Sequence, residues 1–244
     1  MKNFISFSFQ VLISLCLTFV VPTRAGGWTN GRATFYEDAS GAACGYNAGQ
    51  SYGDQIAAVS EALFNNGALC GACYEIMCVN SPNCNRGAGS IKVTATNFCP
   101  STSGPNAWCN PPQKHFDLSI AMFTKLAPYK FGIVPVQFRR IRCARSGGVR
   151  FTISAKTNPN WLEVLVHNVA GDGVVRDVQI KGSRTGWIQM RRNWGQNWDV
   201  SSPPNGQTLS FNVRTTDGRS LLFNNVAPAN WQSGQTFAGK QNFG

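Results

Sequence analysis

The sequence predicts a mainly β protein of two domains, a small disulfide-stapled barrel with short helices followed by a β-sandwich. Three observations favour this fold class. The cysteines stop abruptly before Arg145, short β-rich runs alternate with turn residues, and 244 residues accommodate two ordinary domains. We therefore expect a first domain at 26–144, a short flexible linker at 145–149 and a second domain at 150–244.

The first 25 residues are typical of a secretory signal peptide. Lys2 supplies a positive start, an apolar run spans residues 4–21, and the segment ends on the small residue Ala25. The run is too short and too interrupted to predict a membrane anchor. We expect the mature protein to be secreted.

Cysteine parity agrees with export. Cys16 leaves with the signal peptide, so eight of the nine cysteines remain, and an even number in an oxidising compartment predicts four disulfides. Spacing alone does not select the pairs. A zinc site at Cys70-x-x-Cys73 is the alternative, but no second Cys/His pair follows at zinc-finger spacing. We expect neither a metal nor a cofactor.

In the first domain, strands are predicted by alternation of apolar and polar residues and by β-branched and aromatic runs. The predicted strands are 31–36, 74–78, 91–96 and 134–141. Amphipathic spacing predicts helices at 56–64 and 117–127. Asp117 stands where a residue that caps the second helix would lie.

The second domain is predicted to consist of strands alone. They are 149–154, 161–169, 174–181, 187–192, 209–215 and 221–226. Gly-, Asp- and Pro-containing turns separate them, a spacing typical of a β-sandwich.

Charge narrows the class of partner. Loss of the signal peptide lowers the formal net charge from +11 to +9, and residues 145–244 hold eleven basic and five acidic side chains. The basic residues are scattered, and export removes most nucleic acid from reach. An anionic polysaccharide such as pectin fits this charge better. For any single cation, a solvated surface is the alternative.

Long motifs in both domains resemble the alpha-expansins of plant cell walls. The motifs are Ala33-Thr-Phe-Tyr36, Cys70-Gly-Ala-Cys-Tyr-Glu-Ile76, His115-Phe-Asp-Leu-Ser119, Lys181-Gly-Ser-Arg-Thr-Gly-Trp187 and Arg192-Asn-Trp-Gly-Gln-Asn-Trp198. The resemblance implies a six-stranded double-psi β-barrel related to family-45 endoglucanases. It also implies an immunoglobulin-like, grass-allergen-like β-sandwich that binds carbohydrate. The disulfides implied by the resemblance are Cys44–Cys70, Cys73–Cys143, Cys78–Cys84 and Cys99–Cys109.

The same resemblance implies function. Alpha-expansins loosen walls without hydrolysis, by disrupting non-covalent bonding between cellulose and matrix glucans such as xyloglucan. The resemblance therefore implies these glucans as partners, and pectin joins them on the ground of charge. We expect a monomer that binds no nucleic acid. A barwin-like defence or signalling protein shares the barrel, but the complete second domain argues against that class.

Hydrolysis with inversion requires two carboxyl groups about 6.5–9.5 Å apart. By resemblance, Asp117 matches the endoglucanase general acid, and His115 lies two residues before it in the same motif. Expansins lack the catalytic base, yet Asp38 stands at its offset here because the loop is short. Asp38 is then a cleft-lining residue, the base of a weak inverting endoglucanase, or a solvated side chain.

Other polar residues of the cleft are expected to bind rather than react. Thr34 and Tyr36 would hydrogen-bond to sugar or to Asp117, unless they are ordinary alternating strand residues. Asn97 can hydrogen-bond but cannot act as a base. Three further carboxyl groups of the domain are better explained as structural or solvated; they are Asp54, Glu61 and Glu75.

Aromatic rings stack on the apolar faces of sugars. By resemblance, Trp161 and Trp194 form a polysaccharide-binding platform that Phe35 extends. Trp187, Trp198 and Trp231 are expected in the sandwich core.

Overall fold

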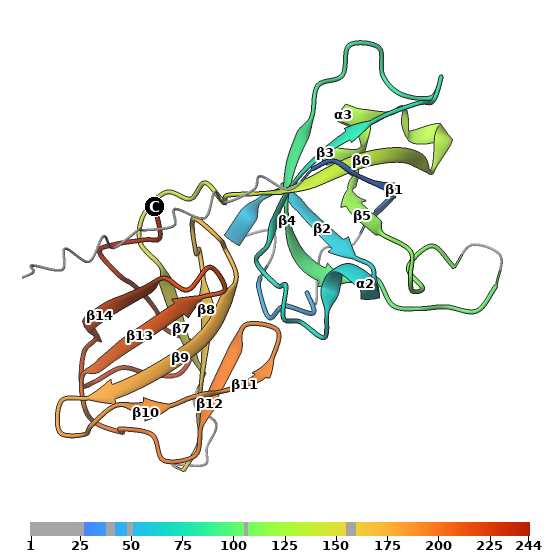
Figure 1. The fold of residues 1–244 in the computed structure, drawn as a ribbon. Helices are drawn as coiled ribbons and strands as arrows, with labels where there is room; N and C mark the ends of the chain where they lie inside the picture. The colour runs from blue at the N-terminus through green and yellow to red at the C-terminus, as the bar shows by residue number, and fades with distance from the viewer. Residues whose placement is uncertain (1–26, 38–41, 48–50, 105–106, 155–159) are drawn as a thin grey trace, which may run out of the picture.

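The computed structural model describes residues 27–37, 42–47, 51–104, 107–154 and 160–244. The predicted signal peptide and Asp38 lie outside these ranges. Figure 1 shows two β lobes joined by a single crossing of the chain, with the N-terminal lobe in blue to green and the C-terminal lobe in orange to red. No helix within the described residues is long and apolar enough to cross a membrane.

Six strands of the first lobe close into a barrel in the order β1-β5-β2-β4-β3-β6. The strands are β1 Thr29–Tyr36, β2 Ile56–Val59, β3 Cys73–Cys78, β4 Ile91–Phe98, β5 His115–Ser119 and β6 Val134–Ile141. β1 pairs with β5 and β2 with β4 in parallel, whereas the other ladders are antiparallel. The predicted barrel class is confirmed, and closure removes the free strand edges.

Alternation along each strand places one set of side chains inside the barrel. Phe116 makes edge-on contacts with Tyr74 and Phe138, at centroid distances of 5.1 and 4.8 Å. Helix α3, Ile120–Leu126, closes one end by burying Met122, Phe123 and Leu126. Two short helical turns complete the lobe, α2 at Glu61–Phe64 and η1 at Tyr129–Phe131.

Two helix predictions are wrong in their first residues. The stretch from Ile56 to Val59 is strand β2, and all four of its residues are buried in the barrel wall. Asp117 lies inside strand β5, so it does not cap a helix. The cap of α3 is Ser119, whose hydroxyl accepts a hydrogen bond from the Met122 backbone N–H at 3.3 Å. Short apolar runs satisfy strand and helix periods equally, which explains both errors.

The second lobe is a sandwich of two sheets, ordered β10-β9-β13-β14 and β11-β12-β8-β7-β15. Its strands are β7 Arg150–Ser154, β8 Leu162–His167, β9 Val175–Gly182, β10 Ile188–Gln189, β11 Arg191–Trp194, β12 Asn197–Val200, β13 Leu209–Thr215, β14 Ser220–Ala227 and β15 Thr236–Ala238. Phe151 stacks on Phe211 between the sheets, with ring centroids 4.3 Å apart. The predicted sandwich is confirmed. The sequence did not predict β12, whose residues are all buried and do not alternate, nor the three-residue β15.

The four disulfides join the pairs that the resemblance implies. They are Cys44–Cys70, Cys73–Cys143, Cys78–Cys84 and Cys99–Cys109. Cys70 and Cys73 therefore bond to different partners and do not act together as a zinc-ligating pair.

The segment 145–149, predicted to be a flexible linker, makes hydrogen bonds to both lobes. The Arg145 guanidinium donates to Thr94 Oγ1 at 2.7 Å and lies over the Tyr52 ring at 4.5 Å. The Asn168 amide donates to the carbonyls of Ser146 and Gly148, both at 2.9 Å. The sequence signal for flexibility, Ser and Gly, did not reveal these acceptors.

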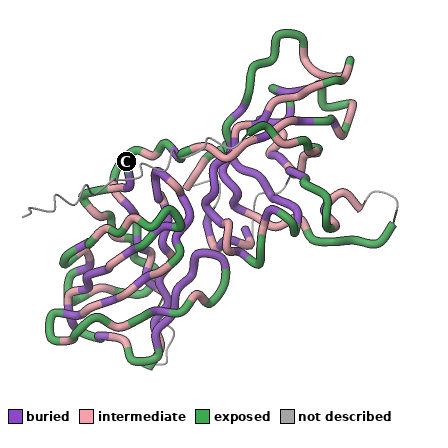
Figure 2. The backbone as a smooth tube through the Cα atoms, viewed as in Figure 1, coloured by how far each residue is buried: buried purple, intermediate pink, exposed green. Residues whose placement is uncertain are grey.

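Backbone contacts also seal the two lobes together, and Figure 2 shows buried chain on both sides of this seam. Cys143 and Gly171 exchange two backbone hydrogen bonds, of 2.6 and 2.9 Å. The Gln196 N–H donates to the Cys44 carbonyl at 3.0 Å, and its side chain donates to the Cys70 carbonyl at 3.1 Å. Gly195 has a φ of +52°, and a Cβ there would lie 2.5 Å from the Cys44 carbonyl carbon.

The outer face of β8 carries a buried histidine whose pKa differs between the folded and the unfolded protein. His167 is 7% exposed, its Nε2 lies 3.1 Å from Thr152 Oγ1, and its cross-strand neighbour is Arg150. Burial, and then the charge of Arg150, lower the pKa of His167 from 6.5 to about 4. In mild acid, between about pH 4 and 6.5, the unfolded chain therefore binds a proton at His167 that the folded protein does not bind.

This difference predicts acid sensitivity. Because the pKa is depressed in the folded state, the stabilisation is complete above pH 6.5 and is lost as the pH falls toward 4. The loss amounts to about 3 kcal/mol of unfolding free energy. Chemical denaturation of H167Q at pH 7 and pH 4 should show a smaller drop than wild type. Equal drops in the two proteins would contradict a neutral buried His167.

Candidate functional site

The outer face of β1 and β5 carries three cross-strand pairs of polar side chains. Parallel pairing sets Arg32 opposite His115, Thr34 opposite Asp117, and Tyr36 opposite Ser119. The alternate residues point into the barrel, as the burial of Ala33, Phe116 and Leu118 confirms. The row spans about 13 Å along the strands.

A hydrogen-bonded chain links the middle of this row. Thr34 Oγ1 donates to Asp117 Oδ1 at 2.8 Å, and His115 Nε2 lies 2.8 Å from the same Thr34 oxygen. A hydroxyl has one proton, so when it donates to the Asp117 carboxylate it must accept from His115 Nε2–H. The neutral imidazole then carries its proton on Nε2.

Burial shifts both titratable groups toward their neutral forms. It raises the pKa of the Asp117 carboxyl, and the Thr34 hydrogen bond opposes that rise. Burial, and then the Arg32 charge, lower the pKa of His115 to about 4. The row can therefore offer a carboxyl group that holds its proton to a higher pH than usual, beside an imidazole that stays neutral in mild acid.

The middle row continues across two more strands. Asp117 pairs with Ala58 of β2, and Ala58 pairs with Asn97 of β4, so the four side chains from Thr34 to Asn97 share one face. Ala58 keeps the floor of this surface low. Asn97 Oδ1 accepts from the backbone N–H groups of Ala43 and Phe98, each at 2.8 Å. The Asn97 oxygen therefore positions the loop at Ala43 and is already engaged by the protein.

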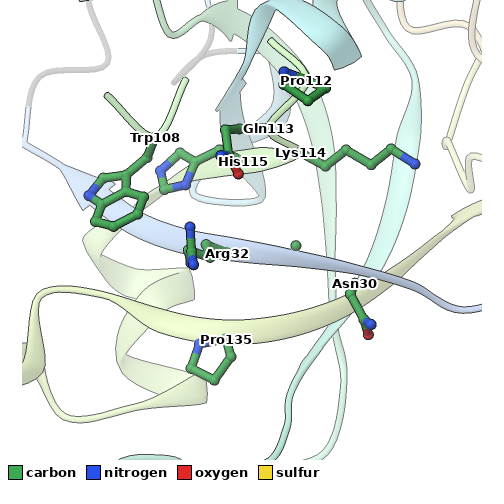
Figure 3. A pocket seen from close by; sticks show the side chains of 9 residues that line it. Asn30, Arg32, Trp108, Pro112, Gln113, Lys114, His115 and Pro135 are labelled. Atoms are coloured by element: carbon green, nitrogen blue, oxygen red, sulfur yellow. The ribbon is translucent and has the colours of Figure 1, made fainter. Parts of the chain in front are cut away.

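A hollow extends the face at each end. Beyond Arg32 and His115 lies a cavity of about 470 Å³ that Trp108, Gln113 and Lys114 also line (Figure 3). Beyond Tyr36 and Ser119 lies a second hollow of about 400 Å³, with Glu37 and Asp54 in its lining. We call the whole surface, with both hollows, the barrel groove.

The structure brings together Thr34, Tyr36, His115 and Asp117 of the predicted cleft. Tyr36 packs against Ala42 and Ile56. Asp38 lies outside the described residues. The prediction for Phe35 needs correction, because strand alternation turns its ring to the opposite side, against Phe123 at 4.9 Å and Tyr129 at 4.3 Å. It therefore packs onto the barrel core and does not extend the tryptophan platform.

The remaining carboxyl groups of the barrel have other roles. Glu75 forms an ion pair with Arg139 at 2.6 Å, and Glu61 accepts from Ser101 Oγ at 2.8 Å. Asp54, predicted to be structural or solvated, is exposed to solvent and borders the groove hollow beyond Ser119. Strand alternation from Asp117 to Ser119 was the sequence signal that could have indicated this end of the groove.

The predicted platform tryptophans lie on the outer face of the five-stranded sheet. Trp194 is 48% exposed and pairs with Asn197, while Trp161 precedes β8 and is half-buried. Acidic groups on this face are engaged, since Glu163 accepts from Asn193 at 2.7 Å and Asp199 pairs with Arg191 at 3.2 Å. The face therefore combines aromatic rings with polar groups whose charges are largely balanced.

The other three tryptophans divide between core and surface. Trp198 is 3% exposed and belongs to the sandwich core, and Trp231 packs against that core from its edge. Trp187 is 40% exposed, with Lys181 Nζ 5.8 Å from its ring centroid, so its predicted core position is wrong. It lies beside β10, at the edge of the opposite sheet.

One loop connects the groove with the platform. At its start, the Ala43 N–H is bound by Asn97 of the groove. Two residues later, Gly45 lies against the side chain of Asn197, the cross-strand partner of Trp194. The segment 42–46 therefore touches both surfaces, and the lobe seam fixes their relative position.

Comparisons with known families identify both lobes. Residues 149–228 match the expansin C-terminal domain family, and residues 56–138 match the family described as lytic transglycolase.

Curated relatives match along most of their length. Expansin-A23 of Arabidopsis thaliana is 54% identical over 225 residues, covering 88% of this chain and 81% of that protein. Expansin-A25 of Oryza sativa subsp. japonica is 43% identical over 256 residues, covering 96% and 98%. The crystal structure of an apo expansin from Clavibacter michiganensis superposes with a TM-score of 0.69 at 21% identity, covering 88% of this chain and 98% of that one. At that identity the superposition supports the fold alone.

The hydrogen-bonded chain predicts how Asp117 responds to loss of Thr34. In T34V the carboxylate loses its donor, so its pKa should rise further; a hydrogen bond to an ionised group contributes about 1.5–3 kcal/mol. Carbon-detected NMR titration of the Asp117 carboxyl measures the change, and T34S, which keeps the hydroxyl, serves as the control. An unchanged pKa in T34V would contradict the assigned donor.

Proposed function

The chain belongs to the alpha-expansin family, and on that premise we propose that it loosens plant cell walls by binding glucan strands without cutting them. The observation that carries this proposal is the joined surface. The barrel groove and the Trp161–Trp194 face meet at the segment 42–46, on lobes locked by backbone hydrogen bonds. Such a surface suits a long polymer rather than a small molecule.

The two parts of this surface have different tasks in the proposed function. The exposed Trp194 ring, the half-buried Trp161 ring and the balanced polar groups suit adhesion to cellulose, because rings stack on the C–H faces of sugars. The groove offers hydroxyl, carboxyl and amide groups for the hydroxyls of a single glucan strand. A protein of this kind shifts an equilibrium between adherent and separated strands only by binding the separated state more strongly. That preference is the core of the proposed mechanism.

The chemistry of the groove supports binding without hydrolysis. Inverting hydrolysis requires a base that faces the general acid across about 6.5–9.5 Å. Among the described carboxyl groups of the barrel besides Asp117, Glu61 and Glu75 are engaged by other side chains. Glu37 and Asp54 line the end hollow, where Glu37 also accepts from the Tyr129 hydroxyl at 3.3 Å. Asp117, with its raised pKa, retains the character of an acid without an assigned base.

We further propose that the protein acts as a secreted monomer in the wall. Secretion into the wall is supported by the signal-like first 25 residues, the four disulfides and the plant relatives. A solved neighbour, a mutant of the Clavibacter michiganensis expansin, was crystallised in complex with cellohexaose. By analogy with that complex, we propose cellulose and matrix glucans such as xyloglucan as partners.

The proposal predicts wall extension without product. Heat-inactivated wall strips held under constant load should creep when the purified mature protein is added, at acidic or neutral pH. Reducing ends released from soluble and amorphous glucan should stay at the level of a protein-free blank. Absence of creep at both pH values would overturn the proposed function.

The competing function is a weak inverting endoglucanase that uses Asp117 and Asp38. It predicts reducing ends that accumulate with time and disappear in both D117N and D38N. That result would replace the binding mechanism by hydrolysis, even if creep were observed.

The platform predicts which tryptophans bind cellulose. W161A and W194A should each weaken adsorption to crystalline cellulose about tenfold, because each removes one stacking ring. W187A is the matched control, since Trp187 is 40% exposed but lies on the opposite sheet, and it should bind as wild type does. Equal effects of all three substitutions, or none, would refute the assigned face.

A further inference from the structure

We propose that the cavity at the Arg32 end of the barrel groove binds the carboxylate of a uronic-acid residue, so that the groove accepts an acidic polysaccharide chain. This inference rests on the proposed function, since it extends the same groove, and it names a class of ligand for one end of it. Four observations carry it.

The first observation is charge. The lining of the cavity contains the cations Arg32 and Lys114 and no carboxyl group, while His115 in the same wall stays neutral above about pH 4. The hollow at the opposite end of the groove is reversed, because Glu37 and Asp54 line it without a cation. An anionic sugar is therefore attracted to the first hollow and repelled from the second.

The second observation is that Arg32 donates to no acceptor in the described chain. Most arginines of the protein have structural partners: Arg140 pairs with Asp172, Arg145 donates to Thr94, and Arg192 donates to backbone carbonyls. No hydrogen bond or ion pair is found for the Arg32 side chain within the described ranges, although the residue is exposed in a cavity wall. Its donors are thus available to a ligand.

The third observation is that the guanidinium is held in place. It lies over the Trp108 ring, 4.5 Å from the centroid, and Trp108 precedes Cys109, which the disulfide to Cys99 anchors. Figure 3 shows Arg32 beside Trp108 and His115, while the Lys114 side chain extends away from these three residues. Stacking uses the face of the guanidinium and leaves its edge, where the N–H groups point, for a planar anion.

The fourth observation is size and position. A volume of about 470 Å³ lies within the usual range of small-ligand sites, so the cavity can admit a sugar residue together with its carboxylate. Arg32 also lies in the same row as Thr34, two residues along β1. A sugar residue bound in the cavity can therefore belong to the same polysaccharide chain as sugars bound in the rest of the groove. A carboxylate fits one guanidinium fork as a bidentate acceptor, whereas a free phosphate would gain nothing from the adjoining groove.

Titration calorimetry on the full mature protein tests the assignment with trigalacturonate as the probe. Wild type should bind it, with affinity that falls as salt is added. R32Q should weaken binding about tenfold or more, and R32K should lie between, because lysine keeps the charge but loses the fork. R86Q is the matched control: Arg86 is exposed on the barrel, does not line the cavity, and should change affinity less than about twofold.

Three results would overturn the assignment. Equal weakening by R32Q and R86Q would mean diffuse attraction to net charge. Equal binding of the same trisaccharide with its carboxyl groups reduced to alcohols would remove the carboxylate from the interaction. Equally tight binding of inorganic phosphate would make the cavity an anion site without sugar recognition.

Two further measurements keep the test decisive. If R32Q fails to fold by its thermal melt, K114Q replaces it; a drop of about two- to fivefold supports the assignment and no drop contradicts it. Wild-type cellulose adsorption and wall creep are measured on the same preparation. If they hold while trigalacturonate fails to bind, this inference fails alone; if creep fails while trigalacturonate binds, the proposed function fails alone.

Discussion

Parallel pairing of β1 with β5 is the constraint on which the groove depends. Parallel neighbours cannot be joined by a tight turn, so a long connection must separate them, and here it contains β2, β3 and β4. The register of this pairing sets Thr34 opposite Asp117, 83 residues away in sequence. A slip of one residue would turn Phe116 toward solvent and Asp117 into the core. Burial of Phe116 and Leu118 therefore both stabilises the barrel and fixes which polar residues of β1 and β5 lie opposite each other.

Contacts at the seam between the lobes fix the position of the sandwich relative to the barrel. Gly195 and Gly173 lie so close to Cys44 and Cys143 that a Cβ at either glycine would overlap the barrel. Two disulfides hold the barrel side of this contact. Cys143 is bonded to Cys73, the first residue of β3, and Cys44 is bonded to Cys70, in the loop just before β3. With backbone hydrogen bonds on both sides, the groove and the tryptophan face behave as one surface, which a freely hinged pair of domains would not provide.

Much of this architecture follows from local pattern, and the failures have physical causes. Alternation predicted β6 at its observed bounds and most sandwich strands, because half-buried strands have period two. Fully buried β2 and β12 lack alternation, so local pattern could not identify them. The motif His115-Phe-Asp117 indicated the centre of the groove, but Arg32 and Trp108 meet only through the fold. Phe35 was misplaced because a motif identifies a residue without saying which face of the strand it occupies.

The distribution of charge along the groove suggests a direction for the bound chain. Acidic side chains at Glu37 and Asp54 border one hollow, and Arg32 and Lys114 border the other, with Asp117 between them. A neutral glucan experiences little net force along such a gradient, so its position is set by hydrogen bonds and stacking. A chain with a single carboxylate experiences attraction at one end and repulsion at the other, which distinguishes its two possible orientations. On the proposals above, this gradient would orient a chain that carries a single carboxylate, whereas it would leave the orientation of a neutral strand to hydrogen bonds and stacking.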